Sequence, residues 1–289
     1  MTDVSPAGKA IVVTGAARGL GRAYAEYLAQ RGAWVVVNDV SGVAEVVGQL
    51  RAAGARALGS TGSVTDPDVA DALVAACVAE FGRIDGLVNN AGVRPEGWSW
   101  EEDPDITRRT VEINLLGTIH CGAAALKAMV RQGSGSIVNV SSRAQCGIER
   151  SATYAATKGA VASLTYSWAL DVPPGVRVNA IAPQARGTGT RRPGAVFRPE
   201  EPEPDAIAPL VAYLLSDAAH RVNGQVVRLV GHPEGMALGL VRHPRGARVL
   251  TRADGWSEAA IAAAFAGELE SELESVGASA LPGTGGSHD

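Results

Sequence analysis

Short apolar runs alternate with longer alanine-rich segments along most of this chain. Seven runs rich in valine, isoleucine and leucine have the length of buried strands: KAIVVT, AWVVVND, ARALGS, RIDGLVN, GSIVNVS, VRVNAIA and QVVRLV. Helices are expected between them, near residues 19–31, 43–53, 66–81, 105–131, 152–171 and 205–216. This alternation predicts an α/β fold with a doubly wound, seven-stranded parallel sheet and helices on both faces.

A glycine-rich turn, TGAARGLG, follows the first apolar run and begins the first helix. Gly15 permits a tight turn, Gly19 lets the backbone approach a pyrophosphate, and Gly21 permits close packing of helix on sheet. The start of the helix offers N–H groups and a positive dipole end to phosphates. The sequence therefore predicts a Rossmann-type dinucleotide site, with Leu20 in the same turn.

Charged residues near this turn bear on which dinucleotide is bound. Asp39 ends the run VVVND, where a carboxylate can accept hydrogen bonds from the adenosine ribose and would repel a 2′-phosphate. Arg18, inside the turn, would instead pair with such a phosphate. Because position 40 is Val40 rather than a second base, we expect NAD to be preferred over NADP.

Composition sets broad limits on the function. The 289 residues are 46% hydrophobic and 19% charged, which is ordinary for a globular protein. The net charge of -4 gives no reason to expect nucleic acid as a partner. The cysteines and histidines lack metal-ligand spacing, so no metal is predicted. Neither a secretory signal nor a long apolar run is recognised, so we expect a cytoplasmic protein without a membrane partner.

Polar residues gather where the later strands are expected to end. NNAG ends the fourth run, and Asn114 lies in the helical segment that follows. Ser141 and Ser142 end the fifth run, and Tyr154 and Lys158 belong to YAATK in the next helix. The carboxyl ends of parallel strands share one crevice, where ligands bind. Tyrosine and lysine four residues apart lie on one helical face, so their polar heads can meet there.

In this order, TGxxxGxG, NNAG, serine, YxxxK and VRVNAIAP resemble the short-chain dehydrogenase/reductase family over residues 8 to about 230. The resemblance implies an NAD(P)-dependent oxidoreductase that interconverts a secondary alcohol and a ketone. Tyr154 would exchange a proton with the substrate oxygen while hydride moves to or from the nicotinamide. A phenol has a pKa near ~10, so Lys158 must favour the phenolate, and it would also hold the nicotinamide ribose. Asn114 would hold a water that links Lys158 to solvent.

Either of two serines could orient the substrate oxygen in this reaction. Counting along the strand from Asn139 gives Ser142, whereas counting back from Tyr154 by the family's usual spacing gives Ser141. Adjacent strand residues point to opposite faces, so both cannot serve equally. We prefer Ser142, because strand register is harder to shift than loop length.

The resemblance also implies cofactor contacts outside the glycine turn. Val64 would pack on the adenine, next to Ser63, which replaces an aspartate often found in the family. Gln184 replaces a glycine after Pro183, and Thr188 keeps the position that touches the nicotinamide carboxamide. The full predicted cofactor set is Gly15, Arg18, Gly19, Leu20, Gly21, Asp39, Val64, Asn90, Ala91, Gly92, Tyr154, Lys158, Pro183 and Thr188.

The alternation continues without a linker, which predicts a single domain. We expect residues 1–230 to form the dinucleotide-binding catalytic domain, with a mobile substrate loop at 184–204 that is rich in proline and arginine. Residues 231–275 would extend the same domain, with irregular structure over 231–255. Residues 276–289 are expected to form a flexible tail.

The sequence says less about the identity of the substrate than about that of the cofactor. Four arginines occur in the predicted loop: Arg186, Arg191, Arg192 and Arg198. They would either bind an anionic handle, such as the phosphates of coenzyme A or of a carrier-protein arm, or remain solvated. GRAYA and VVVND also resemble the 3-hydroxyacyl-CoA dehydrogenase branch of multifunctional β-oxidation enzymes and its bacterial relatives, which keeps a thioester substrate open. Trp98 and Trp100 would either wall the pocket or simply pack.

Two other functions stay open at this point. One is a cofactor-sensing binding protein that has kept the fold without turnover. The other is a biosynthetic ketoreductase that couples reduction to dehydration, epimerisation or ring formation. The family resemblance further implies a homotetramer or homodimer, with the helices that hold Asn114 and Tyr154 at subunit contacts.

Overall fold

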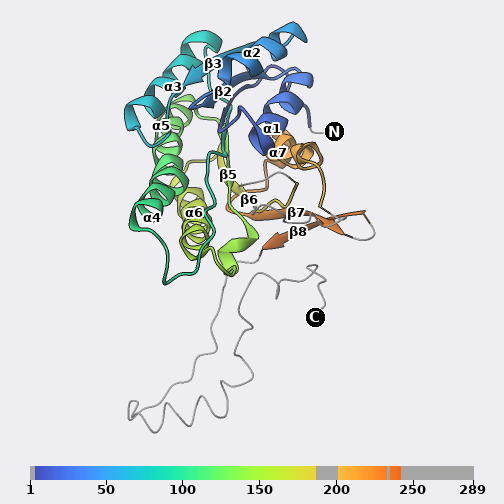
Figure 1. Cartoon of the computed structure of the whole chain (residues 1–289). Coiled ribbons are helices and arrows are strands. Elements are labelled where there is room, and N and C mark those ends of the chain that lie inside the picture. The colour runs from blue at the N-terminus through green and yellow to red at the C-terminus, as the bar shows by residue number, and fades with distance from the viewer. Residues whose placement is uncertain (1–3, 187–200, 233–234, 242–289) are drawn as a thin grey trace.

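A sheet of eight strands forms the middle layer of the molecule (Figure 1). The computed structural model describes residues 4–186, 201–232 and 235–241. Its strands are β1 (Ala10–Thr14), β2 (Trp34–Asp39), β3 (Ala57–Thr61), β4 (Gly86–Asn89), β5 (Gly135–Val140), β6 (Val176–Ile181), β7 (Val226–His232) and β8 (Gly235–Val241). Within the described residues they follow the order β3-β2-β1-β4-β5-β6-β7-β8. The strands β1 to β7 all run parallel to one another.

The eighth strand corrects two expectations: a sheet of seven strands, and irregular structure in the described part of residues 231–255. β8 runs antiparallel to β7 along its whole length, from the Val226–Val241 pair to the His232–Gly235 pair. Its sequence, GMALGLV, contains glycine and alanine, which give a weak strand signal. Three of its large apolar side chains are exposed: Met236, Leu238 and Leu240. Pairing with β7, rather than burial of an apolar face, therefore defines this strand.

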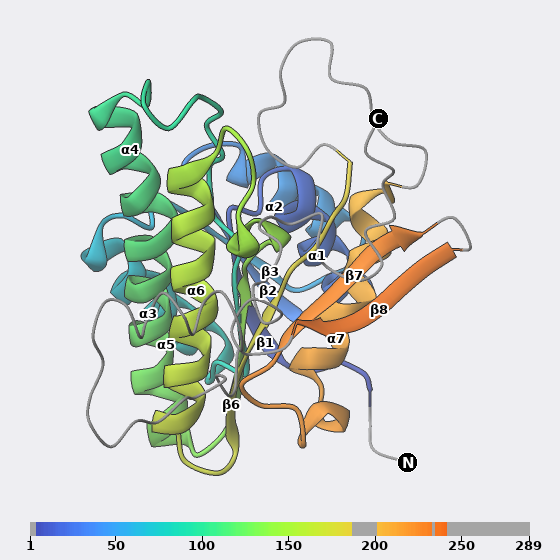
Figure 2. The ribbon, with the colours of Figure 1, turned by 90° about the horizontal axis from the view of Figure 1, so that it is seen from below.

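Helices cover both faces of the sheet, as Figure 2 shows. They are α1 (Gly19–Gln30), α2 (Val43–Ala52), α3 (Pro67–Phe81), α4 (Pro104–Val111), α5 (Gly117–Gln132), α6 (Ala152–Asp171) and α7 (Ala208–Leu215). Side chains of α1, α2 and α7 join one core cluster, and those of α3, α5 and α6 join the other. The predicted doubly wound arrangement is confirmed.

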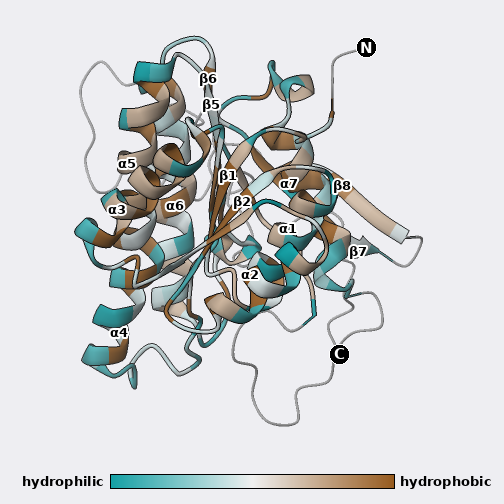
Figure 3. Cartoon of the chain, turned by 90° about the horizontal axis from the view of Figure 1, so that it is seen from above, coloured by the Kyte–Doolittle hydropathy of each residue, from teal (hydrophilic) through white to brown (hydrophobic). Residues whose placement is uncertain are grey.

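The two core clusters explain why the strands are apolar throughout. Ile11 and Val13 of β1 belong to the cluster under α1, whereas Ala10 and Val12 belong to the opposite cluster. All four side chains are fully buried. A parallel strand covered on both faces needs apolar residues at every position rather than at alternate ones. Figure 3 shows this as apolar colour along the central strands and on the helix faces that turn toward them.

Side-chain caps fix where two of the helices begin. The Asp66 carboxylate accepts a hydrogen bond from the Asp68 N–H at 2.9 Å, with Pro67 at the start of α3. The Asp103 carboxylate accepts from the Asp105 N–H at 2.7 Å at the start of α4. Aspartate before a proline satisfies N–H groups that the first helical turn leaves unpaired.

The helix predicted over residues 105–131 is interrupted. Between α4 and α5 lies η1, a π-helical turn from Glu112 to Leu116 that contains Asn114. A π turn adds a residue to a single helical turn, and this change is too short for periodicity to reveal. Across the continuous stretch Pro104–Gln132, the most apolar 18-residue window has a mean hydropathy of 1.3, and 44% of it is buried inside the protein. Ala125 and Met129 of α5 are fully buried in one of the two core clusters.

Candidate active site

The predicted glycine turn joins the end of β1 to the start of α1. Gly15 and Gly19 have φ angles of 62° and 56°, which glycine adopts without strain. A Cβ atom on Gly15 would lie 2.7 Å from Ala91 Cα, and one on Gly21 would lie 2.2 Å from the Gly15 carbonyl oxygen. Both positions therefore require glycine. The first N–H groups of a helix have no partner within it, so the start of α1 suits a phosphate.

Asn90 ties the end of β4 to this turn. Its Nδ2 donates to the carbonyl oxygens of Thr14 and Gly15, each at 3.0 Å. In return, the backbone N–H groups of Asn90 and Ala91 donate to the Thr14 hydroxyl at 3.1 Å. The two predicted cofactor segments, TGAARGLG and NNAG, are thus joined by four hydrogen bonds.

Asp39 is held beside the turn by two backbone N–H groups. Its Oδ2 accepts from Ala17 at 3.0 Å, and its Oδ1 accepts from Val40 at 2.8 Å. Asp39 and Arg18 line the same cavity. The structure therefore fixes one negative charge at the end of β2, where a Rossmann fold receives the adenosine ribose.

Val64 lies in the loop after β3 and is packed on α5. A Cβ atom on Gly117 would lie 2.4 Å from Val64 Cγ2, so this contact leaves no room for a side chain at Gly117. The Ser63 hydroxyl is hydrogen-bonded to the Thr65 hydroxyl at 2.8 Å. Ser63 and Val64 both line the cavity that contains Asp39.

The two neighbouring serines have different partners. The Ser142 hydroxyl lies beside the Tyr154 phenol and acts to lower its pKa, and it accepts a hydrogen bond from the Ala144 N–H at 3.1 Å. The Ser141 hydroxyl is buried and donates to the Lys158 carbonyl oxygen at 2.9 Å. The structure thus places Ser142 at the tyrosine and Ser141 against the backbone of α6.

Lys158 is buried one turn beyond Tyr154. Its Nζ donates to the Val140 carbonyl oxygen at 2.6 Å and lies 5.7 Å from the centroid of the Tyr154 ring. Burial lowers the pKa of Lys158 to about 8. Burial also raises the pKa of the Tyr154 phenol, while the Ser142 hydroxyl and the charge of Arg94 act in the opposite direction. The site therefore combines a desolvated phenol with groups that favour its ionised form.

Arg94 lines the cavity beside Tyr154 but belongs to none of the sequence motifs. Its guanidinium carbon lies 5.7 Å from the centroid of the Tyr154 ring, and its Nη2 contacts Glu96 Oε1 at 3.2 Å. Arg94 is the second residue after NNAG, so it lies at the same edge of the sheet as the predicted residues. This position in the sequence could have identified Arg94, because residues just beyond parallel strands line the ligand crevice.

Asn114 connects η1 to the loop after β4 and to α6. Its Oδ1 accepts from the Val93 N–H at 2.8 Å, and its Nδ2 donates to the Val93 carbonyl oxygen at 2.9 Å. Nδ2 also donates to the Thr157 hydroxyl at 3.2 Å. Asn114 thereby fixes the segment that carries Arg94. That Asn114 holds a water linking Lys158 to solvent stays a prediction.

One cavity of about 680 Å³ joins these parts into a single site. The predicted residues that line it are Gly15, Arg18, Gly19, Leu20, Asp39, Val64, Asn90, Ala91, Gly92, Ser142, Tyr154, Lys158 and Pro183. Gly21 instead lies under the turn, and Asn114 is buried behind the loop after β4. Thr188 lies outside the described residues. The crowded glycine turn, the start of α1 and this long cavity fit a dinucleotide.

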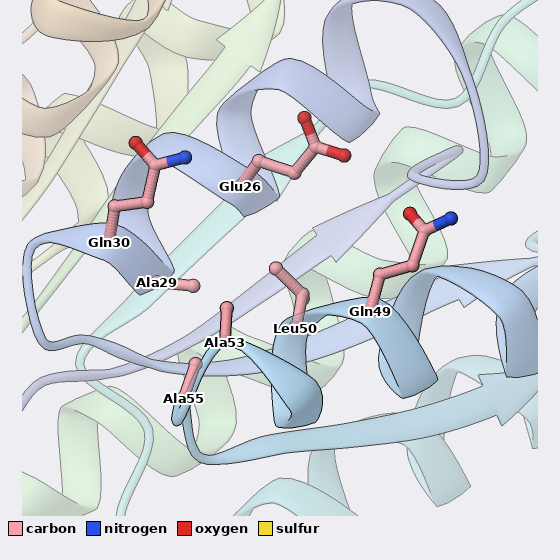
Figure 4. Close-up of a pocket in the computed structure, with 7 residues that line it drawn as sticks. All are labelled: Glu26, Ala29, Gln30, Gln49, Leu50, Ala53 and Ala55. Carbon is pink, nitrogen blue, oxygen red and sulfur yellow. The ribbon is translucent and has the colours of Figure 1, made fainter.

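A second, smaller cavity of about 210 Å³ lies between α1 and α2 (Figure 4). Its wall is formed by Glu26, Ala29, Gln30, Gln49, Leu50, Ala53 and Ala55. None of the predicted site residues lines it, and it is separate from Tyr154. Among the described residues, no three His, Cys, Asp or Glu side chains are grouped to hold a metal ion.

The two tryptophans pack on each other rather than on the cavity. The rings of Trp98 and Trp100 are stacked with centroids 5.1 Å apart, and Arg150 lies over Trp98 at 4.4 Å. Trp100 is 77% exposed, and neither tryptophan is among the residues that line the large cavity. The packing alternative is therefore the one that the structure supports.

The predicted substrate loop is described only at its two ends. Gln184 Nε2 donates to Glu201 Oε1 at 3.4 Å, and Arg186 contacts Glu203 at 3.2 Å. Glu201 is buried at the cavity. Arg191, Arg192 and Arg198 lie outside the described residues, so the proposed anion-binding role of this loop stays a prediction.

The fold and site define a nicotinamide-dependent dehydrogenase: a doubly wound sheet, a glycine turn at the first helix, and a tyrosine–lysine pair in the same crevice. The sequence model of the short chain dehydrogenase family matches residues 9–195. The chain belongs to this family. It is an NAD(P)-dependent oxidoreductase of alcohols and ketones, acting on CH–OH groups.

Two curated relatives are similar over nearly their whole length. The cis-4-hydroxycyclohexanecarboxylate dehydrogenase of Sinomonas cyclohexanicum is 44% identical over 76% of this chain and 94% of the relative. The cyclohexanol dehydrogenase of Rhodococcus sp. is 37% identical over 80% of this chain and 98% of the relative. These relatives support the family, whereas the narrower resemblance to the 3-hydroxyacyl-CoA dehydrogenase branch stays a prediction.

Solved structures share the fold. A short chain dehydrogenase from Mycobacterium avium has a TM-score of 0.83 at 29% identity, covering 93% of this chain and 97% of that one. A gluconate 5-dehydrogenase from Burkholderia cenocepacia, solved with NADP and tartrate, has a TM-score of 0.72 at 29% identity, covering 78% of this chain and 94% of that one.

Proposed function

We propose that the chain oxidises a secondary alcohol on an aliphatic ring to the ketone, with NAD as the preferred cofactor. The placing of Ser142 and Tyr154 together on one cavity, beside buried Lys158, is the observation that carries the assignment of the catalytic groups. The ring is suggested by the relatives named for cyclohexanol and for hydroxycyclohexanecarboxylate. Aliphatic side chains of the cavity would pack on such a ring: Val93, Pro95, Ile106, Ile113 and Ile148.

Each catalytic group has one task in this proposal. A bound nicotinamide would accept hydride from the alcohol carbon. Tyr154 takes the hydroxyl proton, and Ser142 holds the substrate oxygen in place. Lys158, protonated below its pKa of about 8, supplies a positive charge that favours the phenolate. Its hydrogen bond to Val140 keeps that charge at the tyrosine.

The preference for NAD rests on Asp39. Two backbone N–H groups fix its carboxylate at the cavity, so a 2′-phosphate would meet a negative charge there. Arg18 lines the same cavity and would offset part of this repulsion. We expect NAD to give the higher kcat/KM, measured with both cofactors and one alcohol.

A substrate panel tests the proposed function. The purified chain is assayed for NAD reduction with cyclohexanol, cis-4-hydroxycyclohexanecarboxylate, open-chain secondary alcohols and 3-hydroxyacyl thioesters. We expect the ring alcohols to give the highest kcat/KM, and Tyr154→Phe to lower it by roughly 10²- to 10⁴-fold. NADH fluorescence should show that this variant still binds cofactor. Preference for thioesters, or full activity in Tyr154→Phe, would contradict the proposal, and binding without turnover would favour a cofactor sensor.

We also propose that the protein forms a homodimer or homotetramer in the cytoplasm. Support for an assembly comes from exposed apolar side chains on η1, α5 and α6: Leu116, Val130 and Leu170. Size-exclusion chromatography with light scattering measures the state directly. A single species with the mass of one chain would rule the assembly out.

A further inference from the structure

A second cation faces the tyrosine besides Lys158. Arg94 lies in the loop after β4 and lines the large cavity. Its guanidinium carbon is 5.7 Å from the centroid of the Tyr154 ring. A group bound to Tyr154 and a group bound to Arg94 are therefore within the reach of one small molecule.

The surroundings of Arg94 are suited to a carboxylate. Its side chain is 28% exposed, so the charge is partly shielded from solvent. Glu96 orients the guanidinium through Nη2 at 3.2 Å. A guanidinium carries five N–H donors in a fixed fork, so it can serve Glu96 and a second carboxylate together. Apolar side chains line the same cavity, among them Ile113 and Ile148, which would exclude water from such a pair.

We propose that Arg94 binds a carboxylate on the substrate, so that the enzyme acts on a ring hydroxy acid in preference to a neutral alcohol. This inference rests on the proposed function and adds the substrate class to it. It predicts that the substrate resembles that of the relative named for a hydroxycyclohexanecarboxylate more than that of the relative named for cyclohexanol. Charge-assisted, bidentate contacts are the strong and geometrically selective way in which arginine recognises a carboxylate.

Besides Arg18 in the glycine turn, two other arginines that line the cavity are rival anchors. Arg109 is exposed on α4, where solvent screens its charge. Arg143 follows Ser142 and is half-buried at the cavity. Arg94 is favoured because it lies over the ring of Tyr154, the residue that must meet the substrate hydroxyl. Replacing each arginine by glutamine compares the three positions with the same change.

The first experiment compares an anionic substrate with its neutral isostere. The values of kcat/KM are measured for cis-4-hydroxycyclohexanecarboxylate and cis-4-hydroxycyclohexanecarboxamide with saturating NAD. We expect the native chain to prefer the acid, and Arg94→Gln to lower that ratio by roughly 10- to 100-fold. Because both substrates use Tyr154, any effect of Arg94 on the tyrosine cancels in the ratio. Arg94→Lys should keep part of the preference, and Arg109→Gln and Arg143→Gln should leave the ratio within about twofold.

A binding experiment separates this inference from the proposed function. Calorimetry measures the affinity of cyclohexanecarboxylate and of cyclohexanecarboxamide, which lack the reacting hydroxyl, for the NAD-saturated chain and for Arg94→Gln. Tighter binding of the acid that is lost in Arg94→Gln supports the carboxylate site, even if no ring alcohol is oxidised. Equal affinities for the two compounds, no binding of the acid, or a preference lost in Arg143→Gln instead, would overturn it. Turnover of ring alcohols with equal affinities would leave the proposed function intact.

Discussion

The hydroxyl of Ser142 lies beside the phenol of Tyr154 and acts to lower its pKa. Ser141, one residue earlier, donates to the Lys158 carbonyl oxygen instead. Adjacent residues at the end of β5 thus divide two tasks, contact with the reacting group and support of the helix that carries it. The alternation of side chains along a strand produces this division.

Alanine at each serine should separate the two tasks. We expect Ser142→Ala to lower kcat/KM by roughly 10²- to 10³-fold, because a donor that orients the substrate oxygen is lost. Ser141→Ala should keep most of the activity and lower the free energy of unfolding by about 1–3 kcal/mol, since a buried carbonyl loses its donor. Kinetics and urea unfolding measure both effects. Loss of turnover in Ser141→Ala with normal turnover in Ser142→Ala would reverse the assignment.

Stability should depend on pH through Lys158. Its pKa is about 8 in the folded chain, below the ~10.4 of an unfolded lysine, so between these values the unfolded chain binds more protons. The contribution of this residue to the free energy of unfolding therefore rises with pH across that window. Below pH 8 the folded chain bears the full cost of burying the protonated lysine. We expect the difference between the native chain and Lys158→Met to change by about 2 kcal/mol from pH 7.5 to 9.5, in favour of the native chain.

Paired urea titrations isolate this contribution. Burial raises the pKa values of the Cys77 and Cys121 thiols to about 12, which acts in the opposite direction as the pH rises. Both thiols are present in the native chain and in Lys158→Met, so their effect cancels in the difference. A difference that stays constant between the two pH values would show that burial does not perturb Lys158.

Removing the charge of Asp39 should shift the cofactor preference. Asp39→Asn can still accept the hydrogen bond of the Ala17 N–H through its amide oxygen, so the turn keeps its support. We expect the ratio of kcat/KM for NAD to that for NADP to fall by roughly 10-fold, because a fixed repulsion of the 2′-phosphate is lost. Arg18→Gln is the matched control, since it should raise the same ratio. A ratio unchanged in Asp39→Asn would mean that shape, not charge, selects the cofactor.

A methyl group at Gly21 should damage the cofactor site. Its Cβ would lie 2.2 Å from the Gly15 carbonyl oxygen and 2.4 Å from Asn90 Nδ2, so the turn must shift. We expect Gly21→Ala to weaken NADH binding at least about 10-fold by fluorescence titration. A methyl group on Gly48, in α2, would have open space within 4 Å. Gly48→Ala should therefore stabilise the fold by about 0.5–1 kcal/mol and leave NADH binding unchanged.

The sequence was sufficient for the features that local chemistry dictates. Apolar strands such as β1 and the glycine turn each follow from residue types at short spacing. The cavity then brings together motifs as distant as Gly15 and Tyr154, because parallel strands present their carboxyl ends at one edge.

Other features depended on tertiary contacts that no short window contains. β8 exists because β7 offers it an edge, and its own apolar residues point to the exposed side. The π turn at Asn114 spans five residues, too few for a periodic pattern to show it. Arg94 resembles any loop arginine in the sequence, and its importance lies in its distance from Tyr154, which only the folded chain sets.

The pairing of β1 with β4 affects when the cofactor site forms during folding. Thr14 and Gly15 are hydrogen-bonded to Asn90 across about 75 residues of chain, with three strands and three helices in between. Closing so long a loop is entropically costly, and such non-local pairing slows folding. An early folding species that holds only the first three strands would have its glycine turn but not the Asn90 clamp. We therefore expect NAD affinity to appear late in refolding, together with the catalytic groups.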